Sequence, residues 1–177
     1  MNIYDINPGT AEEMNVIVEV PKGSSNKYEI DKETGLIALD RANYSAAAYP
    51  CEYGFVPRTL AEDGDAIDVL LLATYPLLPG VLVKSRPVAY MEMVDTGEAD
   101  PKIIAVPVND KRWSNVKDLA DINPHTLKEL QHFFETYKHL KGQEPNQYMV
   151  TIPSFKGKAE AATAFDKACA LYKEKNG

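Results

Sequence analysis

Short apolar runs fill the first part of the chain and predict β-strands. The runs are rich in β-branched residues and are bounded by glycine, proline or aspartate, which is typical of strands. They lie at residues 16–20, 37–39, 69–73, 81–83, 88–94 and 103–108. Because they follow one another closely, they favour an antiparallel sheet or a small barrel over units in which a helix joins two parallel strands.

Helical spacing begins near residue 123 and predicts a helix that stops at Gly142. Asn123 suits the capping position, and Pro124 suits the first turn. The apolar residues that follow form one stripe: Leu127, Leu130, Phe133, Phe134, Tyr137 and Leu140. Histidines recur at intervals of seven on the same segment and are interpreted as surface residues: His125, His132 and His139.

A second helix is predicted over residues 159–173, with these residues facing inward: Ala162, Phe165, Cys169 and Tyr172. The chain is 45% hydrophobic and 25% charged, so it can bury an ordinary core. The pattern as a whole predicts one β-rich domain over residues 1–177, with helices packed outside the β core.

Composition argues against several classes of protein. The formal net charge of −7 disfavours a nucleic-acid binder that works by neutralising phosphates. No apolar run approaches the length of about eighteen residues that a membrane span needs. Cys51 and Cys169 form no CxxC pair, and the N-terminus lacks the pattern of a secretory signal. Two reduced thiols in a cytoplasmic protein are therefore expected.

The stretch EDGDAIDVLL places four acids within seven residues, directly before a predicted buried strand. Like charges about 4 Å apart repel by roughly 4 kcal/mol at an effective dielectric constant near 20, so bound cations, water or protonation must offset the crowding. Gly64 allows a tight turn between Asp63 and Asp65, and Asp68 enters the strand. Three carboxylates on such a bent segment suit a hard cation such as magnesium or manganese. An acidic surface turn is the alternative.

Two further acidic groups flank predicted strands. One contains Asp95 and Asp100, and its alternative interpretation is an ordinary hairpin turn. In the other, extended geometry places Lys27, Glu29 and Asp31 on one face, with a solvated strand face as the alternative.

Cations and phenols complete a candidate site for a phosphate compound. The cations are Lys27, Arg41, Lys102 and Lys138, and the phenols are Tyr49, Tyr53 and Tyr137. Carboxylates that hold metals, together with Lys and Arg that bind phosphate oxygens, are what a metal-bridged phosphate substrate requires. No P-loop, GxGxxG or HExxH motif is present.

An ordered series of motifs resembles the family I soluble inorganic pyrophosphatases in their short bacterial form. The series is VEVP at 18–21, KYEID at 27–31, DR at 40–41, YPCEYG at 49–54, DGDAIDV at 63–69, the segment 95–102, AVP at 105–107 and HFFETYK at 132–138. The resemblance runs nearly from end to end. The family's aspartate signature usually has Pro or Glu where this chain has Ala66, which carries no ligand and leaves the loop less rigid.

The resemblance implies a β-rich α+β fold, a five-stranded OB-like closed β-barrel with flanking helices. It implies hydrolysis of pyrophosphate to two orthophosphates by metal-activated water attack, dependence on several magnesium ions per site, and a homohexamer. Manganese is the alternative to magnesium as the bound metal. The residues would divide by role as follows: Asp65 as general base; Asp63, Asp68, Asp95 and Asp100 as metal ligands; Glu19 and Glu29 in the outer metal and water network; Lys27, Arg41, Tyr53, Lys102, Tyr137 and Lys138 as phosphate ligands, with Tyr49 as a weaker candidate.

Two other functions are weighed beside this hypothesis. One is a non-catalytic OB-like barrel that binds divalent ions or nucleic acid. The other is a hydrolase that acts on a broader range of phosphoanhydrides. The acidic balance disfavours the first, and the absence of a motif for binding a base or sugar disfavours the second.

Overall fold

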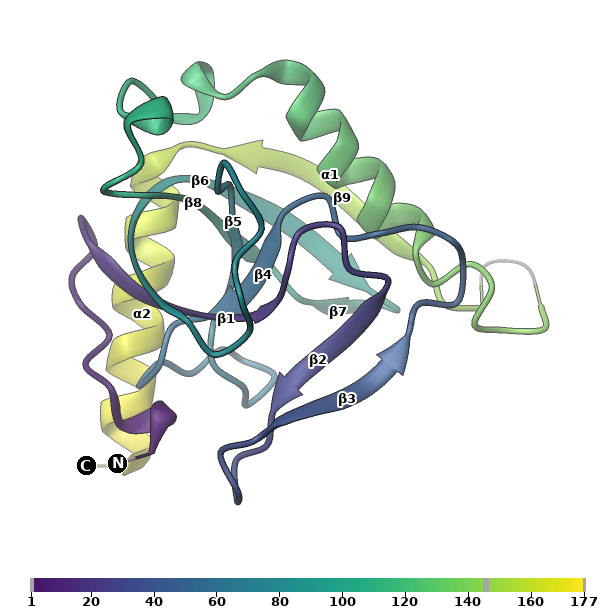
Figure 1. The fold of residues 1–177 in the computed structure, drawn as a ribbon, viewed down its shortest axis with the longest axis horizontal. Coiled ribbons are helices and arrows are strands. Elements are labelled where there is room, and N and C mark those ends of the chain that lie inside the picture. Colours follow the sequence, from purple (N-terminus) through teal and green to yellow (C-terminus); the bar gives the residue numbers. More distant parts are fainter. Residues whose placement is uncertain (1, 145–146, 177) are drawn as a thin grey trace.

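The fold is built on a seven-stranded sheet in a computed structural model that describes residues 2–144 and 147–176 (Figure 1). Its strands are β1 (Met14–Val20), β4 (Glu52–Phe55), β5 (Asp68–Leu71), β6 (Leu82–Asp95), β7 (Glu98–Ala99), β8 (Lys102–Pro107) and β9 (Val150–Lys156). The strand order is β1-β4-β5-β8-β6-β7, and β9 pairs with β6. All pairings are antiparallel except that of β5 with β8. β1 pairs with β6 as well as with β4.

Two strands stand outside this sheet. β2 (Asn26–Ile30) and β3 (Ile37–Ala42) form an antiparallel hairpin of their own, which projects below the main sheet in Figure 1. There are also three short 3-10 helices: η1 (Ile3–Asp5), η2 (Lys111–Trp113) and η3 (Leu119–Asp121).

Every predicted strand overlaps an observed one, but two of the predicted runs belong to the same strand. Residues 81–83 and 88–94 fall largely within β6, which continues through Pro87. The register with β8 shifts between Pro87 and Ala89. A bulge of this kind accommodates the proline, which has no N–H to give to the ladder. Strands β2, β4, β7 and β9 were not among the predicted apolar runs, because polar residues or proline interrupt them.

Helix α1 (Pro124–Thr136) begins where the sequence predicts but ends earlier. The Asn123 side chain accepts a hydrogen bond from the backbone N–H of His125 at 2.9 Å, which confirms the predicted cap. The predicted end at Gly142 is wrong, because the packed stripe stops at Tyr137. Leu140, which the prediction placed inward, is 67% exposed and has no core to cover. The three histidines are exposed, as predicted.

Helix α2 (Lys158–Asn176) agrees with the second predicted helix, although its buried face is rotated slightly. Phe165 is buried as predicted, whereas Ala161 and Ala168 occupy the other buried positions in place of Ala162. Cys169 and Tyr172 are partly exposed. No helix among the described residues is both long enough and apolar enough to span a bilayer.

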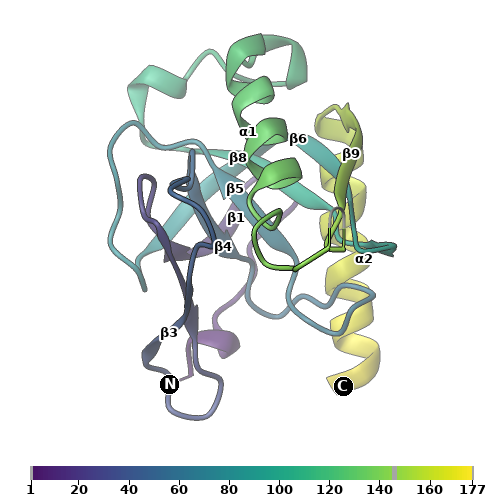
Figure 2. The ribbon, with the colours of Figure 1, turned by 90° about the vertical axis from the view of Figure 1, so that its right-hand side faces the viewer.

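The two helices cover different parts of the sheet (Figure 2). Alternation along β5 explains how one strand serves both: Leu70 packs in the cluster beneath α1, with Phe133 and Phe134. Val69 and Leu71 pack in the cluster beneath α2, with Phe165. Asp68 is the first residue of β5. Because β5 is buried on both faces, the position of Asp68 is fixed by the strand.

Candidate active site

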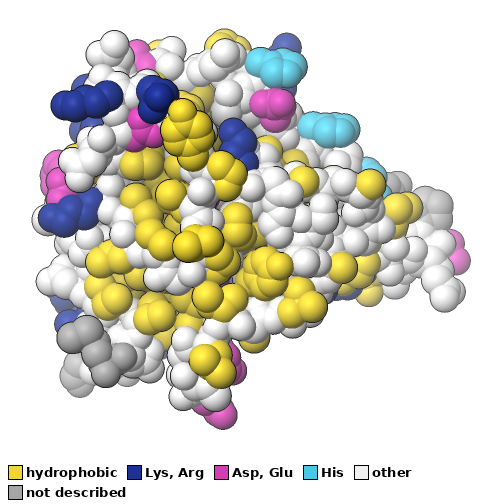
Figure 3. Space-filling model, viewed as in Figure 1, with side chains coloured by type: hydrophobic (Ala, Val, Ile, Leu, Met, Phe, Trp, Pro, Cys, Tyr) yellow, Lys and Arg dark blue, Asp and Glu magenta, His cyan; other side chains and the backbone are white. Residues whose placement is uncertain are grey.

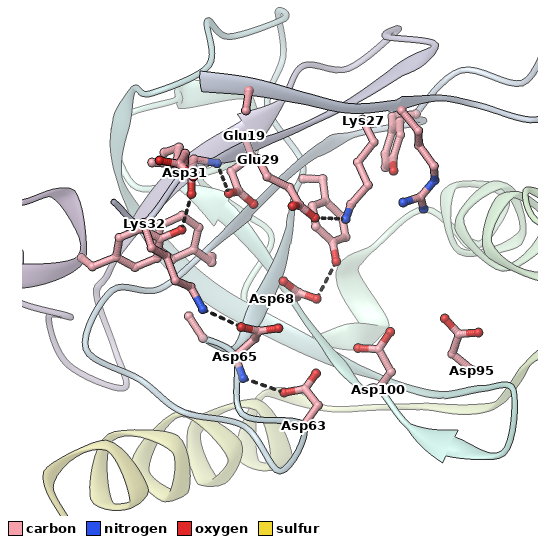
Figure 4. Close-up of a pocket in the computed structure, with 18 of the residues that line it drawn as sticks. Glu19, Lys27, Glu29, Asp31, Lys32, Asp63, Asp65, Asp68, Asp95 and Asp100 are labelled. Carbon is pink, nitrogen blue, oxygen red and sulfur yellow. Dashed lines mark hydrogen bonds and ion pairs between the residues drawn. The ribbon is translucent and has the colours of Figure 1, made fainter. Parts of the chain in front are cut away.

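A cleft of about 660 Å³ lies between the β2–β3 hairpin and the edge of the main sheet (Figure 4). Nine acidic and four basic side chains line it. The acids are Glu19, Glu29, Asp31, Glu33, Asp63, Asp65, Asp68, Asp95 and Asp100, and the bases are Lys27, Lys32, Arg41 and Lys138. Such an excess of negative charge in one cavity calls for bound cations.

The structure brings together the site residues that were predicted from distant segments. Thirteen of them line the cleft: Glu19, Lys27, Glu29, Arg41, Tyr49, Tyr53, Asp63, Asp65, Asp68, Asp95, Asp100, Tyr137 and Lys138. Lys102 does not line the cleft but lies directly beneath two of the acids.

The segment between β4 and β5 directs three aspartates toward the same space. Gly64 adopts φ +93°, and the turn is closed by a bond from the Ala61 N–H to the Asp65 carbonyl at 2.7 Å. The Asp63 carboxylate accepts from the Asp65 N–H at 3.0 Å. Figure 4 shows Asp63, Asp65 and Asp68 along one wall of the cleft. Ala66 packs beside Ile17, Ile30 and Phe55, so its side chain serves the core.

Lys102 anchors this acidic wall from below. The side chain is 2% exposed, and its Nζ lies 2.6 Å from Asp68 and in direct contact with Asp100. Burial alone would lower the pKa of Lys102, but the two carboxylates outweigh it and raise the pKa. Burial raises the pKa of Asp100 despite the contact with Lys102. The Tyr53 hydroxyl donates to Asp68 at 2.5 Å, so Asp68 is held from two sides.

The turn after β6 supplies Asp95 and pairs it with helix α1. Lys138, just beyond the end of α1, contacts the Asp95 carboxylate, and Thr96 donates to it at 2.9 Å. Burial works against ionisation here, but these hydrogen bonds and the charge of Lys138 lower the pKa of Asp95 overall. Tyr137, beside Lys138, is 7% exposed and lines the cleft.

The opposite wall consists of the hairpin. Lys27 faces Arg41 across the two strands, and both pair with acids of the same hairpin. Lys27 contacts Glu29 and lies 3.3 Å from Asp40, while Arg41 lies 2.5 Å from Asp40. Burial would lower the pKa of Lys27, but the hydrogen bond and charge of Glu29 raise it.

Glu19 lies at the back of the cleft, at the end of β1. Its carboxylate accepts from the Ile30 N–H at 2.9 Å. Burial raises the pKa of Glu19 to about 7, a tendency that Asp68 and Glu29 reinforce and that the Ile30 bond and Lys27 oppose. A buried acid of this kind becomes charged readily when a cation arrives.

The donor set fits hard divalent cations, because it consists of carboxylate oxygens. Nevertheless, across residues 2–144 and 147–176 no three acid, histidine or cysteine side chains are close enough together to form a metal site. The acids instead contact ammonium groups: Asp65 contacts Lys32, Asp95 contacts Lys138, and Asp68 shares Lys102 with Asp100. Lysine ammonium groups therefore balance part of the negative charge that bound metal ions would balance, and each contacts one oxygen of a carboxylate.

Several cleft residues were not among the predicted site residues, and Lys32 and Tyr4 are the two with contacts across the cleft or between segments. Lys32 bridges the cleft, with its Nζ 2.7 Å from Asp65. Tyr4 lines the cleft from the N-terminal segment, and its hydroxyl donates to the Ile30 carbonyl at 2.8 Å. Lys32 stands beside the KYEID motif, which offered a clue. Tyr4 offered none, because its contacts are with residues far away in the sequence.

A family model described as inorganic pyrophosphatase matches residues 16–173. The chain belongs to the inorganic pyrophosphatase family. The predicted resemblance is thereby confirmed, and the β-rich fold with two helices is confirmed by solved structures of this family.

Relatives with the same name cover nearly the whole chain. The inorganic pyrophosphatase of Geobacillus stearothermophilus is 45% identical over 157 residues, which are 89% of this chain and 92% of the relative. Soluble inorganic pyrophosphatase 1 of Arabidopsis thaliana is 45% identical over 170 residues, which are 96% of this chain and 78% of the plant protein. The fuller coverage of the bacterial protein agrees with the short bacterial form.

The crystal structure of inorganic pyrophosphatase from Thermus thermophilus superposes on this fold with a TM-score of 0.93. The two sequences are 40% identical, and the match covers 98% of this chain and 99% of the other.

Proposed function

We propose that the chain hydrolyses inorganic pyrophosphate to two orthophosphates in the cleft of Figure 4. The observation that carries this proposal is that the aspartates of the main sheet face Lys27 and Arg41 of the hairpin across one cavity. The acids suit divalent cations, and the lysines and arginine suit the phosphate oxygens. Membership of the inorganic pyrophosphatase family supports the same substrate.

Asp63, Asp68, Asp95 and Asp100 are the proposed holders of the cations, and Glu19 and Glu29 order the surrounding water. Divalent cations, when bound, would lower the pKa of a coordinated water and neutralise charge on the phosphate oxygens. Family members depend on such cations, and we propose magnesium, several ions to a site, with manganese as the alternative. Lys32, Lys102 and Lys138 each contact one oxygen of a carboxylate in this set or of Asp65, so the other oxygen would be available to a cation.

Asp65 is the proposed general base. It accepts a proton from the attacking water as the water oxygen forms a bond to one phosphorus. The bond from that phosphorus to the bridging oxygen breaks, and the second phosphate departs with the bonding electrons. Asp65 suits this role because its side chain is 69% exposed and its ion pair is with Lys32, which is itself 63% exposed.

The phosphate ligands come from both walls. Lys27 and Arg41 on the hairpin, with Tyr137 and Lys138 beyond α1, stabilise the charge that spreads over the transferred phosphoryl group. Tyr49 and Tyr53 lie deeper in the cleft. Lys102 was predicted as a phosphate ligand, and its contacts with Asp68 and Asp100 also give it the task of orienting those two acids.

A closed OB-like barrel of five strands is the proposed description of the sheet. The double pairing of β1, with β4 on one side and β6 on the other, supports it. The sequence of pairings then returns to its start: β1, β4, β5, β8, β6 and β1 again.

A homo-oligomer, proposed as a hexamer by analogy, is supported by the apolar face in Figure 3. Two segments carry exposed apolar side chains: Leu36, Ile37 and Leu39 on one, and Tyr75, Leu78 and Leu82 on the other. The segments adjoin, because a β-carbon added to Gly80 would lie 3.6 Å from Ile37. Patches of this kind mark contacts between proteins.

A cytoplasmic location is also proposed, since Cys51 and Cys169 are both free.

Phosphate release tests the proposed activity. The purified chain, supplied with pyrophosphate and magnesium, should release two phosphates for each pyrophosphate, and a chelator should abolish the release. If neither magnesium nor manganese supports phosphate release, the non-catalytic ion-binding barrel would be favoured. Comparable release from a nucleoside triphosphate would favour the broader phosphoanhydride hydrolase.

A further inference from the structure

The hairpin that bears Lys27 and Arg41 is not part of the main sheet, so something else must fix its position. A two-stranded hairpin is only marginally stable by itself in water. Backbone hydrogen bonds between Tyr49 and residues 23–24 hold the end where the hairpin begins. Contacts between side chains and the hairpin backbone hold the other end. One such set of contacts gathers at Ile30, the last residue of β2.

Both backbone polar groups of Ile30 are bound by side chains from outside the hairpin. The Ile30 N–H donates to Glu19 at 2.9 Å, and the Ile30 carbonyl accepts from the Tyr4 hydroxyl at 2.8 Å. Ile30 is itself 3% exposed and packs with Ile17 and Phe55. The edge of β2 is thus attached to β1 through Glu19 and to the N-terminal segment through Tyr4.

Tyr4 is in turn rigidly placed. Its ring stacks on Phe55 with centroids 4.9 Å apart and an interplanar angle of 16°. Phe55 belongs to β4, which is hydrogen-bonded into the main sheet. Tyr4 also lies outside residues 16–173, the part that the family model matches. The attachment is therefore a feature of the N-terminal segment of this chain.

We infer that Tyr4 is a positioning residue for substrate binding, which fixes the hairpin through the Ile30 carbonyl and so places the hairpin's cations in the cleft. Lys27 lies three residues before Ile30 on the same strand, and Arg41 is its partner across the hairpin. A shift at Ile30 moves both cations together. The bond from the Tyr4 hydroxyl to the Ile30 carbonyl involves none of the aspartates of the sheet wall. The inference rests on the proposed binding of pyrophosphate.

The Tyr4→Phe substitution tests this role, because phenylalanine keeps the stacked ring and removes only the hydroxyl. We expect KM for pyrophosphate at saturating magnesium to rise about fivefold, the cost of one hydrogen bond to a partly buried carbonyl. We expect kcat and the midpoint of magnesium activation to change less than twofold. The dissociation constant of a non-hydrolysable diphosphonate, measured by calorimetry, should rise by the same factor as KM.

Tyr28→Phe is the matched control. The Tyr28 hydroxyl also lies on the hairpin, but it accepts from Asn26 of the same strand and attaches nothing to the sheet. We expect its KM and diphosphonate affinity to match the unaltered chain.

Equal affinities in the Tyr4→Phe variant and the unaltered chain would overturn the inference. A parallel fall in kcat, metal affinity and melting temperature would also overturn it, since that result describes general destabilisation. Failure of the proposed function is a separate result, because the unaltered chain would then release no phosphate. The diphosphonate measurement still compares the variants in that case.

Discussion

The two walls of the cleft differ in how their charges are held in place. On the sheet wall, Asp68 begins a strand that is hydrogen-bonded on both sides and buried on both faces. On the hairpin wall, Lys27 and Arg41 belong to a two-stranded ribbon that side chains attach to the rest. The strand that begins at Asp68 in the wall proposed to hold metal ions is thus fixed by backbone hydrogen bonds on both sides, whereas side-chain contacts help to hold the wall proposed to bind phosphate.

Burial of the site's charges is greatest at Lys102. Lys102, which supports the acidic wall, has a side chain that is 2% exposed, whereas Lys27 is 19% exposed and Lys32 is 63% exposed. Ion pairs lose strength as water reaches them. The largest effects on stability should therefore come from the sheet wall.

The largest expected effect is the loss of kcat when Asp65 is replaced. This substitution distinguishes the catalytic role proposed for the sheet wall from the substrate binding proposed for the hairpin wall. Asp65→Asn should lower kcat by about 10²- to 10⁴-fold, the usual contribution of a general base. Magnesium and diphosphonate should still bind, because the other acids and the cations are intact. Steady-state kinetics and calorimetry measure the two quantities, and an unchanged kcat would remove Asp65 from the proposed role.

Lys102→Met should have the largest effect on stability. Removal of one partner from a buried ion pair costs about 3–5 kcal/mol, because Asp68 and Asp100 are then left close together without a counter-charge. The free energy of unfolding in urea, measured with a chelator present, tests this loss. Magnesium should restore part of it by binding the same carboxylates. A loss no larger than that of Lys27→Met would contradict the difference between the walls.

Glu19 joins the two walls, and its raised pKa makes a pH-dependent contribution. Its pKa is about 7 in the folded chain against an ordinary value of 4.5, so the folded state holds the proton more tightly. The resulting stabilisation is fully present below pH 4.5 and is lost as the pH rises through 7. The difference is about 3 kcal/mol.

Glu19→Gln tests this contribution without removing the side-chain oxygen that accepts from Ile30. In metal-free urea unfolding between pH 4.5 and 8, the variant should lose less stability than the unaltered chain as the pH rises. Identical pH profiles of unfolding free energy for the two proteins would show that burial does not raise the pKa of Glu19.

The smallest effect is expected at the Lys32–Asp65 ion pair, which spans the cleft between the hairpin and the aspartate segment. The Lys32 and Asp65 side chains are 63% and 69% exposed, so their pairing contributes about 0–1 kcal/mol. Lys32→Met should therefore leave the urea midpoint nearly unchanged. A loss comparable with that of Lys102→Met would mean that the hairpin is held mainly by this pair, and not through Ile30.

Local patterns allowed part of this structure to be predicted. The β-branched runs marked the strands, and Asn123 with Pro124 marked the start of α1, because these features act within a few residues. The end of α1 was misplaced because helical spacing continued to Leu140, where no core lies beneath it. The hairpin attachment was missed entirely, since Tyr4 and Ile30 are 26 residues apart.

Motifs in the sequence were enough to identify the family and to propose a set of carboxylates, cations and phenols as its site. Only the tertiary structure decided how those charges are shared, with Lys102 beneath two acids and Tyr4 bound to Ile30. The physical reason is distance. Propensity and periodicity act between neighbours in the chain, whereas ion pairing, burial and the attachment of one wall to the other arise between segments that meet only after folding.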